Sequence, residues 1–263
     1  MTHPFTPRIG AVFSADIAVP EHEREVRFYA RVLGTGDRPL WREDLMNTRG
    51  TPIIGLGERI QEYAELPLQW MPHVQVDDVA TSVERSVELG GRVLMHDKDE
   101  HGASLWAVLL DPNGAAFGVI PVIPEAMMPD AVGAEDEATP SGHIAWLDLT
   151  VPNAVETRDF YRQVIGWAVQ EVEMTDEGVR YTDFNMLAED GAPAAGVCCA
   201  RGVNQGLPPV WIIYLPVGDL AESLRRVEAD GGRVIKTLLD EAGETSYAAI
   251  EDPVGASLVL FQA

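Results

Sequence analysis

The sequence lacks the features that tie a chain to a membrane or to a secretory compartment. It has two cysteines, Cys198 and Cys199. Neighbours on a strand point to opposite faces, so they form no disulfide framework, and one thiol should point inward as a small apolar filler. No apolar run approaches the roughly 18 residues of a membrane span. The first residues also lack the charged start and apolar stretch of a signal peptide. We therefore expect a protein of the reducing cytoplasm.

Positive charge is equally scarce. Two lysines, Lys98 and Lys236, stand among 19 basic residues, while 42 acidic residues give a formal net charge of −23. The excess is negative throughout: −7 in residues 1–123, −5 in 124–140 and −11 in 141–263. Such a field repels phosphate backbones and anionic membrane surfaces. We therefore expect neither nucleic acid nor a membrane as a partner.

What the chain does have is an internal repeat. Residues 14–34, SADIAVPEHEREVRFYARVLG, match residues 146–166, WLDLTVPNAVETRDFYRQVIG. In both, an alternating apolar run ends in Val-Pro, and a helical stretch carries Phe-Tyr toward a Gly. Residues 76–122 match residues 217–263 in the same way, with Gly-Gly over Gly-Gly and Asp-Pro over Asp-Pro. A period of about 132–141 residues is too long for a solenoid, so each copy should be a globular domain.

Hydrophobic periodicity divides each copy into two βαβββ units. Residues 10–20 alternate like a strand, and a helix with an apolar face follows. Short strand-like runs come next, at 39–46 and 52–58. The pattern restarts at 70–76 with a helix over 78–89 and three further strands, and the second copy repeats this order. The predicted domains are residues 1–123 and 141–263, and the Pro-, Ala- and acid-rich residues 124–140 are the predicted linker.

The tandem βαβββ units, with VP…FY…G in the first and DPNG or DPVG in the second, resemble the vicinal oxygen chelate superfamily. This group includes glyoxalase I, the bleomycin-resistance proteins and the extradiol dioxygenases. The sequence is most similar to two-domain actinobacterial members that are often labelled hydroxylases and are found beside antibiotic pathways. The resemblance implies an α+β fold of tandem glyoxalase-like domains. In each domain, two βαβββ units would curl their sheets around a cavity.

The resemblance also implies where a metal would be held, with one ligand on each of four strands of a domain. The positions on first strands hold Ser14, Met71, Trp146 and Ile212, and two of those on last strands hold Gly118 and Val259. At the remaining positions Glu58 is the one candidate, and we expect it to be out of register at the end of its strand. A divalent ion needs about three convergent ligands. We therefore predict no metal and no other cofactor.

Side chains at even offsets from these positions share their face of the sheet, and they define the candidate ligand-binding residues. These are Asp16, His73 and Gln75 in the first domain, and Trp146, Asp148 and Tyr214 in the second. A few polar groups in an apolar pocket are typical of small-molecule sites. An aromatic ligand could stack on Trp146, with Asp148 or Tyr214 binding a hydroxyl. Alternatively, Asp16 and Asp148 are structural and bond the backbone, and His73 is a satisfied residue at a barrel mouth.

Three interpretations of function follow. In the first, the protein is a metal-free binding or accessory protein for a small hydrophobic or aromatic ligand, such as an antibiotic-like metabolite. In the second, it is a lyase, isomerase or oxygenase-like enzyme that uses a displaced metal or Asp/His acid–base chemistry. In the third, one domain has lost its pocket and supports the other. The sequence assigns no catalytic residue, does not decide whether the protein is an enzyme, and leaves a homodimer open.

Overall fold

The computed structural model describes residues 7–36, 39–41, 44–46, 52–124, 144–239, 243 and 245–263. Apart from Pro124, the predicted linker lies outside these residues. No helix within them has the length and apolar character needed to cross a membrane. The helices and strands of the first repeat are β1 (Val12–Val19), α1 (His22–Leu33), β2 (Leu40–Trp41), β3 (Asp44–Met46), β4 (Pro52–Glu58), β5 (Met71–Val76), α2 (Val79–Glu88), β6 (Arg92–Lys98), β7 (Ser104–Leu110) and β8 (Ala116–Pro121).

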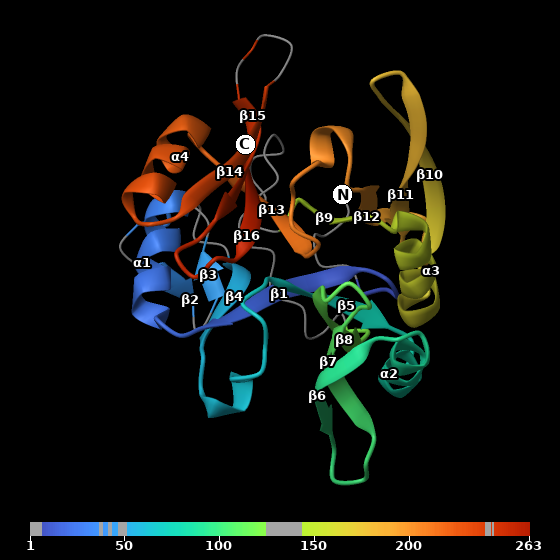
Figure 1. Ribbon diagram of the computed structural model, residues 1–263. Coiled ribbons are helices and arrows are strands. Elements are labelled where there is room, and N and C mark those ends of the chain that lie inside the picture. The colour runs from blue at the N-terminus through green and yellow to red at the C-terminus, as the bar shows by residue number, and fades with distance from the viewer. Residues whose placement is uncertain are drawn as a thin grey trace. The chain divides into compact units, whose positions relative to one another are not determined.

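The second repeat has the same order of elements (Figure 1). They are β9 (Trp146–Val151), α3 (Ala154–Ile165), β10 (Ala168–Asp176), β11 (Val179–Leu187), β12 (Pro193–Cys199), β13 (Trp211–Val217), α4 (Leu220–Ala229), β14 (Arg233–Leu239), β15 (Thr245–Glu251) and β16 (Ser257–Gln262). Short 3₁₀ turns lie at η1 (Gln61–Tyr63) and η3 (Gly202–Asn204).

The elements form four βαβββ modules. Module 1 contains α1 and β1–β4, module 2 contains α2 and β5–β8, module 3 contains α3 and β9–β12, and module 4 contains α4 and β13–β16. In each module the first strand pairs in parallel with the last, because a helical crossover can return the chain in the same direction, and the remaining strands are antiparallel. Strands β1–β8 belong to one eight-stranded sheet and β9–β16 to a second. The predicted α+β fold of tandem βαβββ units is confirmed.

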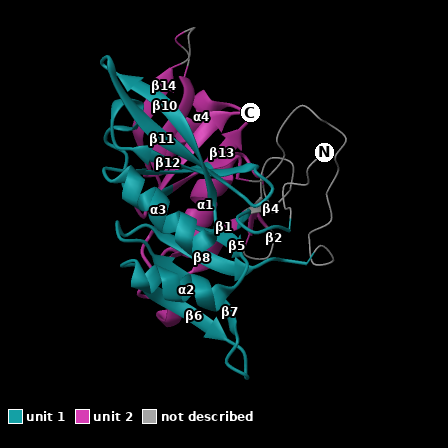
Figure 2. Ribbon diagram, turned by 90° about the vertical axis from the view of Figure 1, so that its right-hand side faces the viewer, with its two compact units in different colours: residues 1–13, 71–129, 147–211 teal, residues 14–70, 130–146, 212–263 magenta. Residues whose placement is uncertain are grey.

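Grouped by contact, the chain divides into two compact units (Figure 2). Unit 1 consists of residues 1–13, 71–129 and 147–211, and unit 2 of residues 14–70, 130–146 and 212–263. Unit 1 therefore combines modules 2 and 3, and unit 2 combines modules 1 and 4. The repeats and the compact units are thus two different divisions of the same chain.

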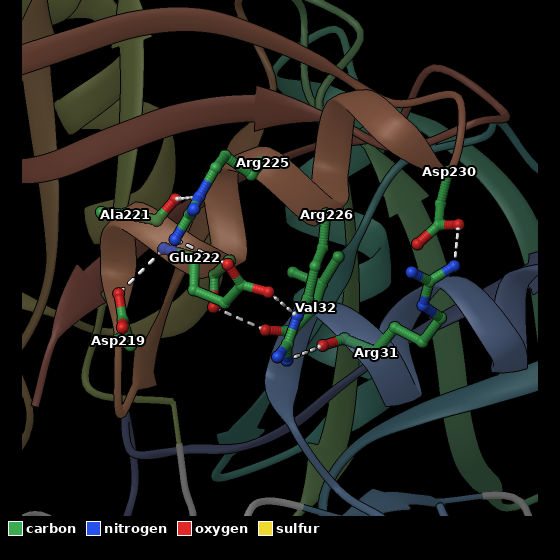
Figure 3. A network of polar contacts seen from close by, with 9 residues as sticks. Arg31, Val32, Asp219, Ala221, Glu222, Arg225, Arg226 and Asp230 are labelled. Carbon is green, nitrogen blue, oxygen red and sulfur yellow. Dashed lines mark hydrogen bonds and ion pairs between the residues drawn. The ribbon is translucent and has the colours of Figure 1, made fainter.

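Unit 2 has a core built from both ends of the sequence. Ala15, Ile17 and Val19 of β1 lie in one apolar cluster with Leu258 and Leu260 of β16, each at most 1% exposed. Helices α1 and α4 contact each other beside this core. Figure 3 shows polar contacts between them: Arg226 Nη1 donates to the carbonyl of Arg31 (2.8 Å), and Arg31 forms an ion pair with Asp230 at the end of α4 (2.5 Å). Within α4, Arg226 Nε donates to Glu222 (2.9 Å).

Unit 1 repeats this arrangement with α2 and α3. Ser82 Oγ of α2 donates to the carbonyl of Val164 (2.8 Å), as Ser223 Oγ of α4 donates to that of Val32 in unit 2 (2.7 Å). The unit 1 core is rich in aromatic rings, and Tyr161 contacts four of them at centroid distances of 5.1–5.9 Å. They belong to Phe117, Phe160, Trp167 and Trp211.

The repeated sequence motifs meet inside each unit. In unit 2 the hydroxyl of Tyr29 donates to Asp252 of DPVG (2.7 Å), and in unit 1 that of Tyr161 donates to Asp111 of DPNG (3.3 Å). Each aspartate also accepts backbone N–H groups of its own turn, such as that of Ala256 on Asp252 (2.8 Å). The Phe-Tyr motif of one repeat and the Asp-Pro motif of the other therefore form one buried contact, which explains why both copies carry both motifs.

Candidate functional site

The first strand of each module separates a core face from a more open face. On β9, Leu147, Leu149 and Val151 are at most 1% exposed and belong to the core, whereas Trp146 and Asp148 on the opposite face are half-buried. The other first strands have the same alternation, with half-buried side chains at Ser14 and Asp16, at His73 and at Tyr214. Met71 and Ile212 also lie on the open-face side of the alternation but are buried, 3% and 1% exposed. That these faces enclose cavities stays a prediction.

A glycine lies beside the polar side chain of three first strands. In the ladder, Asp16 is opposite Gly55, His73 opposite Gly118 and Asp148 opposite Gly196. A Cβ atom at any of these glycines would overlap the side chain opposite it. Glycine therefore gives each polar side chain the room to lie over the last strand of its module.

Module 4 departs from this pattern. Its first strand places Tyr214 opposite Val259, and the ring of Tyr214 lies 6.1 Å from that of Tyr247 on β15. A valine leaves less room than a glycine, and here the open face carries the rings of Tyr214 and Tyr247. The four equivalent positions thus hold Asp, His, Asp and Tyr, and the chemistry of the open face differs between modules.

The open face of module 3 carries several polar groups around Asp148. Cys198 Sγ donates to Asp148 Oδ1 at 3.8 Å, and Asp183 of β11, 6% exposed, accepts the backbone N–H of Cys199 at 2.7 Å. Burial raises the pKa of the Cys198 thiol, and the charges of Asp148 and Asp183 raise it further. Burial and then Asp183 raise the pKa of Cys199 to about 11. Both thiols are protonated at neutral pH, and Cys199 points to the opposite face of β12, so the open face offers carboxyl groups and the S–H donor of Cys198 but no thiolate nucleophile.

The open face of module 3 continues along β11. Tyr181 and Asn185 lie two residues on either side of Asp183, so they share its face. The guanidinium of Arg201 lies 4.6 Å from the centre of the Tyr181 ring and 3.8 Å from Asp176. This face therefore combines an aromatic ring, a cation and three carboxyl groups, those of Asp148, Asp176 and Asp183. Burial is also the main cause of the raised pKa of Asp183.

The structure places the predicted ligand-binding residues differently in the two units. In unit 1, Gln75 is fully buried and its Oε1 accepts the backbone N–H of Ile123 (3.0 Å), which is a structural contact. His73 and Asp148 are half-buried beside their glycines. In unit 2, Asp16 lies beside Gly55 and Tyr214 beside Tyr247. Ligand binding by these residues stays a prediction. The alternation in RYTDFN points to Tyr181, Asp183 and Asn185, but their link to Asp148 requires the strand register.

The residues at the family's metal positions do not fit a metal. On first strands, Met71 and Ile212 are buried and apolar. On last strands, the residues opposite the polar side chains are Gly55, Gly118, Gly196 and Val259. Glu58 pairs with Val19, three residues beyond Gly55, and is exposed on the opposite face. No group of three or more His, Cys, Asp or Glu residues suited to a metal occurs in the described part of the chain.

Comparison with known proteins agrees with the fold. A family model described as "Glyoxalase-like domain" matches residues 13–120, and one described as "Glyoxalase/Bleomycin resistance protein/Dioxygenase superfamily" matches residues 142–260. CFP32 of Mycobacterium tuberculosis, which its name assigns to the glyoxylases, is 28% identical over 73% of this chain and 68% of its own. The anthracycline biosynthesis protein DnrV of Streptomyces peucetius is 32% identical over 46% of this chain and 47% of its own.

A solved structure has a similar fold over nearly the whole chain. The 2,2',3-trihydroxybiphenyl 1,2-dioxygenase of Sphingomonas wittichii aligns with a TM-score of 0.54 over 97% of this chain and 91% of its own, at 13% identity. At that identity the likeness shows the fold alone. The two family matches establish that the chain belongs to the glyoxalase/bleomycin resistance protein/dioxygenase superfamily, as the resemblance of its motifs implied.

Proposed function

We propose that the protein binds a small hydroxylated aromatic metabolite on the open face of module 3. In this proposal it acts as a binding or accessory protein without the metal site of its superfamily. Asp148 and Asp183 accept ligand hydroxyl groups, Tyr181 provides an aromatic contact, and Trp146, two residues before Asp148 on β9, offers a further stacking surface. Asp16, His73 and Tyr214 are the corresponding ligand contacts on the other modules.

One observation carries this proposal: glycine stands at last-strand positions where the superfamily's metal ligands would be. At Gly118 and at the equivalent Gly55 and Gly196, a neighbouring polar side chain fills the space that a ligand side chain would need. The open faces have thus kept polar groups suited to hydrogen bonding and lack the convergent ligand set of a divalent ion. A few polar groups beside aromatic surface are typical of sites that orient small molecules.

The relatives support the same class of ligand. DnrV is named for anthracycline biosynthesis, and the dioxygenase from Sphingomonas wittichii is named for a trihydroxylated biphenyl. Both names describe compounds with hydroxylated aromatic rings. The match to DnrV spans about half of each protein, so its whole activity is not transferred to this chain.

The test is a titration with 1,8-dihydroxyanthraquinone, a flat hydroxylated aromatic probe. Quenching of the protein's tryptophan fluorescence reports binding. We expect saturable quenching in the wild type. Asp148→Asn should raise the Kd about tenfold to a hundredfold, because a hydrogen bond to a charged group contributes about 1.5–3 kcal/mol. The matched control is Glu173→Gln on β10, an exposed acidic residue on the opposite face. Absence of saturable quenching, or an unchanged Kd in Asp148→Asn, would contradict the proposal for module 3.

Metal analysis separates this proposal from an enzyme with a displaced metal. We expect the purified protein to hold no stoichiometric Zn, Ni, Fe or Mn, and probe binding to be unchanged by a chelator or by added metal. A tightly held equivalent of one of these metals, lost together with probe binding on chelation, would favour the enzyme instead.

A further inference from the structure

A buried carboxyl group distinguishes unit 2 from unit 1. Glu25 lies in the first turns of α1, and none of its surface is exposed. Neither Oε1 nor Oε2 of Glu25 has a hydrogen-bond partner among the residues that the structure describes. A buried carboxylate without such partners is unfavourable by several kcal/mol, and a group in this position generally keeps its proton instead.

The groups around Glu25 reinforce this preference. Asp252 faces it from the β15–β16 turn, and Tyr29, one helical turn further along α1, donates its hydroxyl to Asp252. The pKa of Glu25 is raised to about 7. Burial is the largest cause, the negative charge of Asp252 is the next, and the charge of Glu21 adds to the effect. Arg24 opposes the shift, but its guanidinium is directed to Glu21 at 3.4 Å and is partly exposed.

Unit 1 has a satisfied pair at the equivalent place. The repeat aligns Glu25 with Thr157 and Val254 with Asn113. In unit 1, Asn113 Nδ2 donates to Thr157 Oγ1 at 2.9 Å. The neighbouring Tyr-Asp contact is the same in both units, so this substitution leaves unit 2 with an unpartnered acid where unit 1 has a neutral hydrogen bond.

We propose that Glu25 is a pH-sensitive element of unit 2: it is protonated in the folded protein, and its ionisation beside Asp252 loosens the packing of α1. An unfolded glutamate loses its proton near its ordinary pKa of 4.5, and the folded one near 7. Between these values the folded state binds more protons than the unfolded state, so unit 2 loses stability as the pH rises from about 4.5 to 7. Below this window the stability is fully present, and above it the loss is complete.

The test is amide hydrogen exchange of the full-length protein at pH 5 and pH 7.5, corrected for intrinsic exchange rates. The protection of the α1 amides should be more than tenfold lower at pH 7.5 than at pH 5. If these amides exchange only through global opening of unit 2, the fall should be about a hundredfold. The equivalent helix α3 of unit 1 is the internal reference and should fall less. Glu25→Gln should abolish the excess fall in α1, and Glu23→Gln, an exposed acid on the same helix, should leave it in place.

A second variant covers the case in which Glu25→Gln does not fold. The double variant Glu25→Thr with Val254→Asn transfers the unit 1 pair into unit 2, and α1 should then respond to pH like α3. The proposal is overturned if protection of α1 and α3 changes equally in the wild type. It is also overturned if the excess fall in α1 persists in Glu25→Gln or in the double variant.

Discussion

At the scale of single residues, the glycines of the last strands decide what the open faces can hold. Gly118→Ala should lower the free energy of unfolding by about 1–3 kcal/mol, because the new methyl group would overlap the ring of His73. Gly57→Ala in β4 is the control, since the nearest atom to a Cβ there is 4.0 Å away. Adding His73→Ala should recover most of the loss in Gly118→Ala. Chemical unfolding measures all three, and equal stability of the two glycine variants would contradict the assignment.

The buried tyrosines give a second prediction at this scale. Tyr161 donates to Asp111 and accepts the indole N–H of Trp211 at 2.9 Å. Tyr161→Phe therefore leaves both a buried carboxyl and a buried N–H without this partner, and we expect a loss of about 2–4 kcal/mol. Tyr29→Phe should also destabilise, through Asp252. Thermal unfolding of both variants measures the loss. A neutral surface substitution changes stability by up to about 0.5 kcal/mol, so a change no larger than this would contradict a role for these bonds.

Sequence patterns predict which face a residue occupies better than which residues it meets. Alternation on β1 and β9 correctly placed Asp16 and Asp148 opposite the core. The proximity of Asp148, Cys198 and Asp183 depends on the pairing of three strands, which no local pattern contains. Glu25 is a further case, because an acidic residue in the first turns of a helix is usually solvated there and stabilised by the helix dipole.

At the scale of elements, one buried hydroxyl group bonds the two helices of each unit to each other. Ser82→Ala should destabilise by about 1 kcal/mol, because Ser82 Oγ bonds the carbonyl of Val164 on α3. Ser86→Ala on the same helix is the matched control, since Ser86 is buried and its Oγ bonds no group in the described part of the chain. If the two variants unfold alike, the α2–α3 bond contributes nothing measurable.

The elements themselves follow closely from the sequence. The predicted helix over 78–89 is observed as α2, Val79–Glu88, with Asp78 capping its first turn, and the predicted strand-like run at 52–58 is β4 with the same bounds. The run at 39–46, predicted as one strand, contains β2 and β3 instead. Alternation and capping are local signals and therefore predictable, whereas a tight reversal within eight residues is hard to distinguish from a continuous strand.

At the scale of the whole molecule, the net charge of −23 should weaken the folded state through self-repulsion. Raising NaCl from 20 mM to 500 mM shortens the Debye length from roughly 20 Å to about 4 Å, so the Tm should rise by several degrees. Thermal scans at constant pH test this, with sucrose as a control for effects on apolar burial. A Tm that falls over this range would show that attractive ion pairs outweigh the repulsion.

The repeat predicts similarity between modules but not which modules pack together. Both copies carry the Phe-Tyr and the Asp-Pro motif. The sequence therefore allows the two motifs to meet within one copy or between the copies. The Tyr29–Asp252 and Tyr161–Asp111 bonds show that both compact units take one module from each copy. The division of the chain into domains 1–123 and 141–263 remains a prediction from sequence.

Unit 2 is built from segments that lie far apart in the sequence, and this sets an order for folding during synthesis. Unit 1 consists mainly of residues 71–211, so most of its core is available before the final fifth of the chain leaves the ribosome. The unit 2 core joins β1 to β16, and these contacts have a sequence separation that spans nearly the entire protein. Contacts of such separation form slowly. A nascent chain that ends before β16 would therefore expose the apolar faces of β1 and α1, and it would depend on chaperones until its last strand arrives.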